Sequence, residues 1–155
     1  MNDNQDLETK GILIIDFQDE HKEEMFKIHN EVLPENDKMT KQNFYDEFSE
    51  PSRKYFVAKI NENIVGYLGL FECEDDENII GIAIKKEFQN KGIGTRLIEK
   101  AVEFGIKNKK KSLSLEVDEK NIKAFEFYQK NKFVVTNVRK KYYKDNDAYI
   151  MFRYL

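Results

Sequence analysis

Two glycines separated by one residue stand between a β-branched run and an amphipathic helix pattern. The run before them, residues 79–85, is rich in isoleucine and predicts a buried strand that ends near Lys85. The apolar residues from Ile93 to Ile106 recur at spacings of three, four and five, which indicates one face of a helix. A turn from strand to helix directs several backbone N–H groups and the positive end of the helix dipole toward one point. An anion can bind at such a point, and a tight turn without a ligand is the alternative.

The spacing of these glycines restricts the phosphate ligands that fit. The chain contains no GxxxxGK[ST] loop of nucleotide triphosphatases, and the third glycine of a dinucleotide fingerprint is missing after Gly94. The spacing Gln-x-x-Gly-x-Gly at Gln89, Gly92 and Gly94 resembles instead the pyrophosphate-binding motif of the GCN5-related N-acetyltransferases. Enzymes of this family use acetyl-coenzyme A.

Composition favours one domain and excludes several partners. A chain of 155 residues that is 40% hydrophobic builds one sizeable core, so residues 1–155 are expected to form a single domain. With 26 basic and 29 acidic residues the net charge is −3, which predicts neither a nucleic-acid nor a membrane partner. The lysine-rich segment 107–111 is interpreted as a solvated helix end, where cations suit the dipole.

Cysteine and histidine usage argues against a metal site. The single Cys73 cannot form an internal disulfide or a thiolate metal site, and it is expected to be a buried or edge-strand thiol. His21 and His29 are eight residues apart, without the i, i+4 spacing of a zinc pair, and are expected in core or solvent positions. The polar opening, residues 1–11, lacks an apolar signal core, and a cytoplasmic location follows as an expectation.

The order of elements predicts a mixed α/β sheet. A strand over 11–17 precedes a helix stopped by Pro34 and a second helix capped by Thr40. Residues 55–71 predict two strands, and the acidic turn 72–78 leads to the strand before the glycines. After the long helix come a strand SLSLEV, a helix NIKAFEFYQK, and two strands around FVVTNV and AYIMF. This order resembles the whole GCN5-related fold, a mostly antiparallel sheet of about seven strands flanked by four helices.

A second motif lies in LEVDEKNIKAFEFYQKNKF, residues 115–133. In its strand, Glu116 alternates with the aliphatic residues and is therefore available to a cleft. In its helix, Asn121 and Tyr128 are seven residues apart and share one stripe with Ala124. Taken singly, Glu116 could be a solvent-facing carboxylate, Asn121 a helix cap and Tyr128 a core aromatic.

Together these residues resemble a subgroup, the ribosomal-protein alanine N-acetyltransferases and the N-terminal protein acetyltransferases. The tail KKYYKDNDAYIM, residues 140–151, extends this resemblance through its double tyrosine and its Asp-Ala-x-x-Met strand. Three departures accompany it. Asn90 stands where relatives often carry arginine, and Lys132 stands where many have glycine, at an expected left-handed helix end beside Asn131. The segment 32–35 lacks the Phe-Pro-Trp type of sequence that helps to form the acceptor groove in the bacterial relatives.

The resemblance implies a role for each site residue. Glu116 would take the proton of the acceptor amine through a water, and Tyr128 would protonate the departing thiolate. An α-amine with a pKa of about 8 is roughly 10% neutral at pH 7, so it needs less help from a base than lysine does. Acetyl-coenzyme A would be bound by Ile82, Ala83 and Ile84 along the pantetheine, by Gln89, Asn90, Lys91, Gly92, Ile93, Gly94 and Thr95 around the pyrophosphate, and by Asn121. Tyr142 and Tyr143 would hold the acceptor peptide.

Three functions are compatible with the sequence. The first is acetylation of a protein N-terminal α-amine, and the second is acetylation of a small amine or polyamine, which the acidic turn 72–77 would suit. The third is an acyl-coenzyme A binding domain without catalysis, which the presence of Glu116 and Tyr128 disfavours. The double tyrosine favours the first.

Replacing Gly94 with glutamate is expected to abolish binding of acetyl-coenzyme A. A bulky carboxylate at the start of the helix would obstruct the phosphates and repel them. Calorimetric titration with the coenzyme measures this, and an unchanged affinity would remove the assignment of the site.

Overall fold

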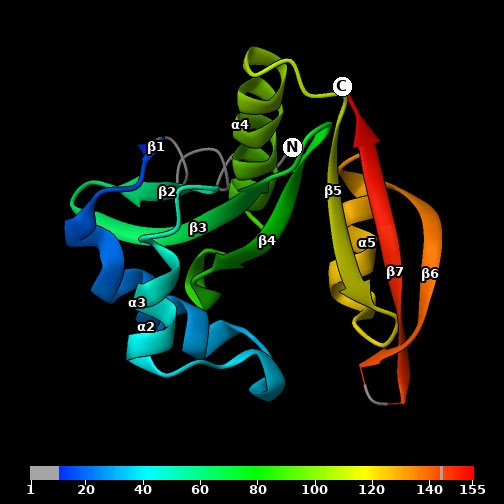
Figure 1. Cartoon of the computed structure of the whole chain (residues 1–155). Helices are drawn as coiled ribbons and strands as arrows, with labels where there is room; N and C mark the ends of the chain where they lie inside the picture. The colour runs from blue at the N-terminus through cyan, green and yellow to red at the C-terminus, as the bar shows by residue number, and fades with distance from the viewer. Residues whose placement is uncertain (1–10, 144) are drawn as a thin grey trace. The chain divides into compact units, whose positions relative to one another are not determined.

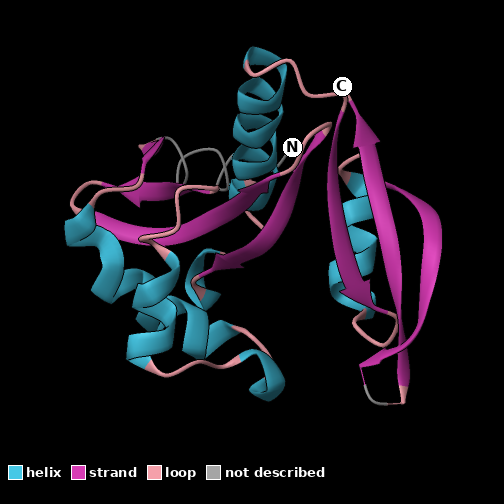
Figure 2. Cartoon of the chain, viewed as in Figure 1, coloured by secondary structure: helices cyan, strands magenta, loops and turns pink. Residues whose placement is uncertain are grey.

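The computed structural model describes residues 11–143 and 145–155, with the side chains of Asn36, Tyr142 and Tyr143 outside that description. The strands are β1 (Ile12–Asp16), β2 (Arg53–Ile60), β3 (Asn63–Glu72), β4 (Asp76–Ile84), β5 (Ser112–Asp118), β6 (Val134–Tyr143) and β7 (Asn146–Tyr154) (Figure 1). The α-helices are α2 (Lys22–Val32), α3 (Lys41–Glu47), α4 (Ile93–Lys107) and α5 (Ile122–Lys130) (Figure 2). Short 3-10 helices occur at η1 (Asp19–His21), η2 (Glu35–Asp37) and η3 (Lys86–Phe88).

The seven strands follow the order β1-β2-β3-β4-β5-β7-β6. The pairs β1–β2, β2–β3, β5–β7 and β6–β7 are antiparallel. The pair β4–β5 is parallel, with Asp76–Asn78 beside Ser112–Ser114, because α4 carries the chain back to the starting end of β4. The predicted mixed, mostly antiparallel sheet with four helices is thereby confirmed.

The chain divides into two compact units. The first comprises the chain up to Phe71 together with Ile80–Lys100, and the second comprises Glu72–Ile79 together with Ala101–Leu155. The chain passes from one unit to the other within β4 and within α4.

The core of the first unit forms where α2 and α3 pack on β2 and β3. Phe44 of α3 is 1% exposed and makes ring contacts with Phe26, His29, Phe48 and Tyr67. As predicted, α2 ends before Pro34, which has no N–H to continue a helix. The Thr40 side chain caps α3 by accepting a hydrogen bond from the Asn43 N–H at 3.2 Å.

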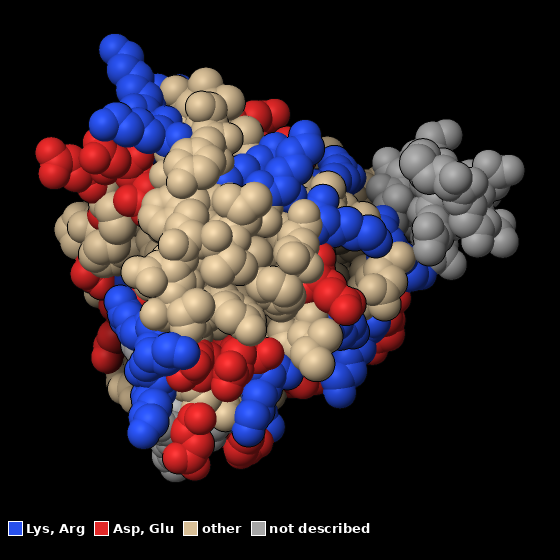
Figure 3. All heavy atoms as spheres, turned by 90° about the vertical axis from the view of Figure 1, so that its right-hand side faces the viewer, with Lys and Arg blue, Asp and Glu red and all other residues tan. Residues whose placement is uncertain are grey.

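The second unit places α5 against the strands β5, β7 and β6. The Phe125 ring of α5 lies 5.0 Å from the Tyr149 ring of β7, and Tyr128 meets Phe133 edge-on at 5.7 Å. The predicted left-handed end of α5 is confirmed, since Lys132 has φ 71°. On the face seen in Figure 3, uncharged side chains form a continuous area bordered by charged ones. Val134 and Val135 of β6 are exposed apolar residues.

One expectation for the acidic turn is wrong. The turn was expected to reach Asn78, but β4 already begins at Asp76. The reason is a buried serine on the parallel strand: the Ser114 hydroxyl donates to the Asp76 carboxylate and accepts from the Asn78 amide at 2.9 Å. These bonds compensate the polar side chains for the water that strand pairing removes.

The lysine-rich segment is an exposed helix end, as expected, except at Lys110. The Lys110 side chain is only 9% exposed, and its ammonium donates to the Cys73 carbonyl at 2.6 Å and to the Glu72 carboxylate at 3.2 Å. Lys111 pairs with Asp75 at 3.4 Å. The lysines therefore neutralise part of the acidic turn within the same unit.

Over the described residues, no helix combines the length and the apolarity needed to cross a membrane.

Gly66 on β3 is predicted to be irreplaceable because β4 approaches it closely. A Cβ at Gly66 would lie 2.9 Å from the Ala83 carbonyl oxygen and 2.7 Å from Ile84 Cδ1. Gly66→Ala is expected to lower the free energy of unfolding by about 1–3 kcal/mol, measured by urea denaturation.

Gly11→Ala is the matched control, because a Cβ there would meet no atom within 4 Å. Equal stability of the two variants would contradict the close approach.

Candidate active site

The loop after β4 is held by the glutamine of the Gln-x-x-Gly-x-Gly motif. The Gln89 side-chain Nε2 donates to the Ile84 carbonyl oxygen at 2.9 Å, which ties the loop to the end of the strand. Asn90 has φ 61° and Gly92 has φ 87°, so both lie in the left-handed region. Asparagine tolerates this conformation better than most residues, which gives Asn90 a backbone role at its position. Gln89 thus shapes the loop, and its predicted contact with the coenzyme stays a prediction.

Gly92 is required by its backbone angle and leaves open space above the loop. A Cβ at this position would meet no protein atom within 4 Å. The first helical hydrogen bond runs from the Arg96 N–H to the Gly92 carbonyl at 3.1 Å. The N–H groups of Ile93, Gly94 and Thr95 therefore lie in the first turn of α4, where backbone donors have no partner within the helix. Ile93 is 1% exposed and anchors this turn in the core.

The strand segment expected beside the pantetheine is less buried than its composition suggested. Ala83 is buried at 2% exposure, whereas Ile82 and Ile84 are half-buried and Ile80 is 37% exposed. The burial alternates because successive side chains point to opposite faces of a strand. At its end, the Lys85 N–H donates to the Val65 carbonyl at 2.8 Å, which fixes the exit from β4 against β3.

The candidate base Glu116 is paired with an arginine that the sequence analysis did not identify. Glu116 lies on β5, and its Oε1 is 3.0 Å from the Arg139 guanidinium of β6. A quarter of the Glu116 side chain is exposed, so the carboxylate is within reach of water. An ion pair of this kind combines a hydrogen bond with the attraction of opposite charges.

The candidate acid Tyr128 is largely a core residue. It is 9% exposed, and its ring packs edge-on against Phe133. Its backbone carbonyl accepts hydrogen bonds from Asn131 and Phe133, at 3.1 Å and 3.0 Å. The buried Asn131 in turn receives a bond from Arg153 of β7 at 3.3 Å. The end of α5 that carries Tyr128 is therefore rigidly placed.

Asn121 caps α5, which was one of its two expected roles. Its Oδ1 accepts a hydrogen bond from the Ala124 N–H at 3.2 Å, and its own N–H donates to Asp118 at 2.9 Å. The cap uses the oxygen of the side-chain amide, so an acceptor on a ligand would bind the nitrogen.

Tyr142 and Tyr143 close strand β6, with Tyr143 opposite Asn146 in the register of β7. Their side chains lie outside the described residues, so their predicted contact with an acceptor stays a prediction.

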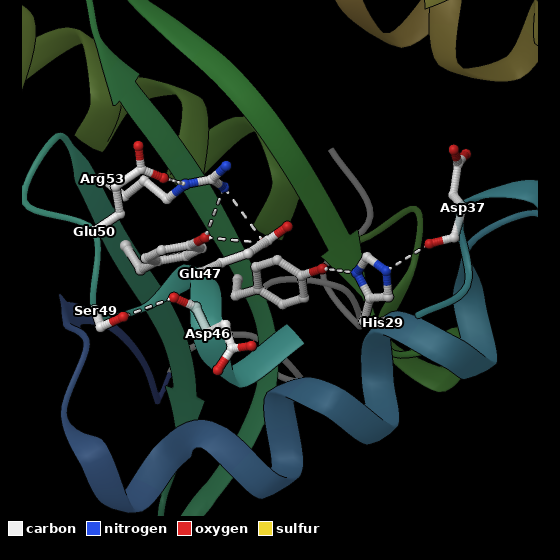
Figure 4. A network of polar contacts seen from close by, with 9 residues as sticks. His29, Asp37, Asp46, Glu47, Ser49, Glu50 and Arg53 are labelled. Carbon is white, nitrogen blue, oxygen red and sulfur yellow. Dashed lines mark hydrogen bonds and ion pairs between the residues drawn. The ribbon is translucent and has the colours of Figure 1, made fainter. Parts of the chain in front are cut away.

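A buried histidine network holds the connection between α2 and α3 (Figure 4). The His29 ring is 8% exposed, with Nε2 2.8 Å from the Asp37 carbonyl oxygen and Nδ1 2.5 Å from the Tyr67 hydroxyl. A carbonyl only accepts, so Nε2 carries the proton and Nδ1 accepts from Tyr67. Burial raises the pKa of Tyr67 far above its ordinary value, which keeps that hydroxyl a donor. The core position expected for His29 is confirmed, but no local sequence signal connects it with Tyr67.

The same face of the first unit holds an arginine cluster (Figure 4). Arg53 contacts Glu50 at 2.9 Å and Glu47 at 3.4 Å, and it donates to the Tyr55 hydroxyl at 3.4 Å. Burial raises the pKa of Tyr55 to about 12. These contacts join the end of α3 to the start of β2.

Cys73 is the single cysteine of the chain. Cys73 is half-buried, and burial raises the pKa of its thiol, which lowers the thiolate fraction at neutral pH. A role as nucleophile is therefore disfavoured.

Among the described residues, no group of three or more His, Cys, Asp or Glu side chains is placed to hold a metal ion.

Comparison with known proteins assigns the family. The model of the acetyltransferase (GNAT) family matches residues 15–133, and the chain belongs to this family, as its motifs predicted. The putative [ribosomal protein bS18]-alanine N-acetyltransferase of Bacillus subtilis is 38% identical over 115 residues, which cover 72% of this chain and 76% of that protein. An N-alpha-acetyltransferase of Saccharolobus solfataricus is 30% identical, over 84% of this chain and 86% of that protein.

A solved protein structure has the same fold as this chain. The crystal structure of Ard1 from Thermoplasma volcanium superimposes with a TM-score of 0.83 at 26% identity and covers 94% of this chain and 98% of that chain.

Tyr128→Phe is expected to lower kcat by roughly 10- to 10⁴-fold, the range of general-acid catalysis, with a smaller effect on coenzyme binding. The ring contact with Phe133 is retained, so the variant is expected to fold. Steady-state kinetics and thermal denaturation measure the two effects.

Tyr149→Phe is the control, because it removes a hydroxyl from another packed tyrosine of the same unit. A fully active Tyr128→Phe enzyme would reduce Tyr128 to a core residue.

Proposed function

We propose that this protein transfers the acetyl group of acetyl-coenzyme A to the N-terminal α-amine of a protein, with a ribosomal protein as the expected class of acceptor. The observation that carries the proposal is the 38% identity with the Bacillus subtilis protein named for alanine acetylation of bS18. The Saccharolobus relative, which aligns over most of both chains, is likewise named as an N-alpha-acetyltransferase.

The coenzyme pyrophosphate is proposed to bind at the start of α4. The open space above Gly92 and the N–H groups of the first helical turn support this, and no bulky side chain is needed for the binding. Lys91 adds a cation beside Gly92. The backbone of Ile82–Ile84 would bond the pantetheine amides, and the Asn121 amide nitrogen would donate to the coenzyme.

The reaction requires two proton transfers. The neutral amine nitrogen attacks the thioester carbonyl, the C–N bond forms and the C–S bond breaks, which yields an amide and coenzyme A. In the proposal, Glu116 accepts, through water, the proton that the amine nitrogen loses as the amide forms. The Tyr128 hydroxyl gives its proton to the thiolate and recovers one from solvent. Correct positioning of both substrates supplies much of the remaining acceleration.

Residues 1–155 are proposed to act as one acetyltransferase domain. The chain changes unit inside β4 and inside α4, so neither unit is a continuous segment joined to the other by a linker. A cytoplasmic location remains a prediction from the sequence.

The acidic turn does not favour the polyamine alternative. Its Glu72 and Asp75 carboxylates already pair with Lys110 and Lys111, and Glu77 is only 2% exposed. A polycation would have to displace Lys110 and Lys111 from these carboxylates. Acetylation of a small amine and coenzyme binding without catalysis remain as outcomes of the assay.

The assay compares three acceptors with the wild-type enzyme. One is a peptide with a free N-terminus and no lysine, the second is its N-terminally blocked twin with an internal lysine, and the third is spermidine. We expect the free N-terminus to be acetylated with the highest kcat/KM, and Tyr142→Ala or Tyr143→Ala to weaken that preference. Preference for the blocked twin or spermidine would overturn the proposal, and coenzyme binding without turnover of any acceptor would leave only the binding domain.

A further inference from the structure

The β6–β7 hairpin contains a bulge that includes Tyr142 and ends before Tyr143. Arg139 pairs with Ala148 and Tyr143 pairs with Asn146, so three residues of β6, 140–142, stand opposite the single residue Asp147 of β7. Such a bulge bends a strand and changes which way its following side chains point. The bulge therefore includes Tyr142 and sets the register in which Tyr143 pairs with β7.

The Asp147 carboxylate contacts two residues of the bulge. Its Oδ1 accepts a hydrogen bond from the Lys141 N–H at 2.9 Å, and its Oδ2 is 3.3 Å from the Lys140 ammonium. Lys141 has φ 53°, a left-handed conformation that costs a non-glycine residue energy. The bond from its N–H supplies the partner that the bulge takes away from the β ladder. This bond lowers the pKa of Asp147, so the carboxylate is ionised at neutral pH.

The backbone of Asp147 is held from the other side by the turn between β5 and α5. Its N–H donates to the Glu119 carboxylate at 3.3 Å, and its carbonyl accepts from the Glu119 N–H at 3.0 Å. The neighbouring Asn146 amide donates to Asp118 at 3.3 Å. Asp147 thus links a fixed turn of the second unit, through its backbone, to the bulge of β6, through its side chain.

Lys140 contributes less to this arrangement. Its side chain is 79% exposed, whereas that of Asp147 is 22% exposed. An exposed lysine pair is screened by water and ions, whereas the Lys141 N–H has a fixed direction. The hydrogen bond to the backbone, rather than the charge pair, fixes the bulge.

We propose that Asp147 is a positioning residue for acceptor recognition, which holds the β6 bulge, and with it the backbone of Tyr142 and Tyr143, in one conformation for the acceptor peptide. This rests on the proposed function of the site. Asp147 does not touch the reacting atoms, so its loss weakens binding of the acceptor and leaves the coenzyme site intact. The Asp-Ala-x-x-Met pattern gains a structural meaning from it: Ala148 and Met151 are fully buried, and Asp147 shapes the hairpin.

The test uses three substitutions of Asp147 in the full-length enzyme. Asp147→Ala removes the acceptor of the Lys141 hydrogen bond, Asp147→Asn keeps an oxygen at the same place without the charge, and Asp147→Glu keeps the charge on a longer side chain. We expect the alanine and glutamate variants to raise the KM of the free-N-terminus peptide by about tenfold or more. The asparagine variant is expected to stay within about threefold of wild type.

Controls separate this role from general loss of structure. The dissociation constant of acetyl-coenzyme A, measured by calorimetry, is expected to change by less than about twofold in all variants. Asp145→Ala removes an exposed carboxylate from the same turn and is expected to behave as wild type. If Asp147→Ala does not fold, Asp147→Glu remains as the disrupting variant, with thermal denaturation as the check.

The outcomes distinguish the two proposals. If the wild-type enzyme acetylates the free N-terminus but the alanine and glutamate variants keep its KM, Asp147 is not a positioning residue. Rescue by glutamate but not by asparagine would also overturn the inference, because charge would then be the determinant. If the wild-type enzyme itself does not acetylate free N-termini, the proposed function fails, and the inference fails with it.

Discussion

The left-handed turn between β4 and α4 is the constraint on which the rest of the first unit depends. Gly92 adopts a φ of 87°, and the chain can therefore leave the strand and enter α4 within a few residues. Gln89 holds the same loop to the carbonyl of Ile84, so the position of the helix start is fixed from the strand end. The buried Ile93 then seats the first turn in the core. An anion site at this helix start needs this rigidity, because backbone donors bind a phosphate only where they already converge.

Side chains that bond to backbone atoms fix the irregular segments elsewhere in the chain. Loops need such partners because their backbone groups lack the ladder of a sheet or a helix. His29 and Asn30, in the last turn of α2, hold the Asp37 carbonyl and both backbone groups of Met39. In the second unit, Lys110 holds the Cys73 carbonyl and Asp147 holds the Lys141 N–H. Each of these connections is thereby held by hydrogen bonds between a side chain and the backbone.

The two candidate catalytic residues, Glu116 and Tyr128, lie in different surroundings. Glu116 is partly exposed and paired with Arg139, so its carboxylate is within reach of both water and a cation. Tyr128 is buried, and its ring packs against other aromatic rings at the end of α5, so the position of the ring is restricted. A base that exchanges protons with water benefits from exposure, whereas an acid that serves one leaving group benefits from fixed geometry.

The sequence alone determined the family, the order of the elements, the cap at Thr40 and the helix end at Lys132, because these depend on local periodicity, turn chemistry and motif spacing. Only the tertiary structure decided the pairings between residues distant in sequence. Lys110 appeared as part of a solvated run and instead lies against the acidic turn, and Glu116 appeared unpaired until β6 brought Arg139 beside it. Likewise, the sequence showed Asp147 only as part of a motif, and the register of β6 and β7 places it opposite the bulge. Such partners are chosen by strand order and register, which no local pattern specifies.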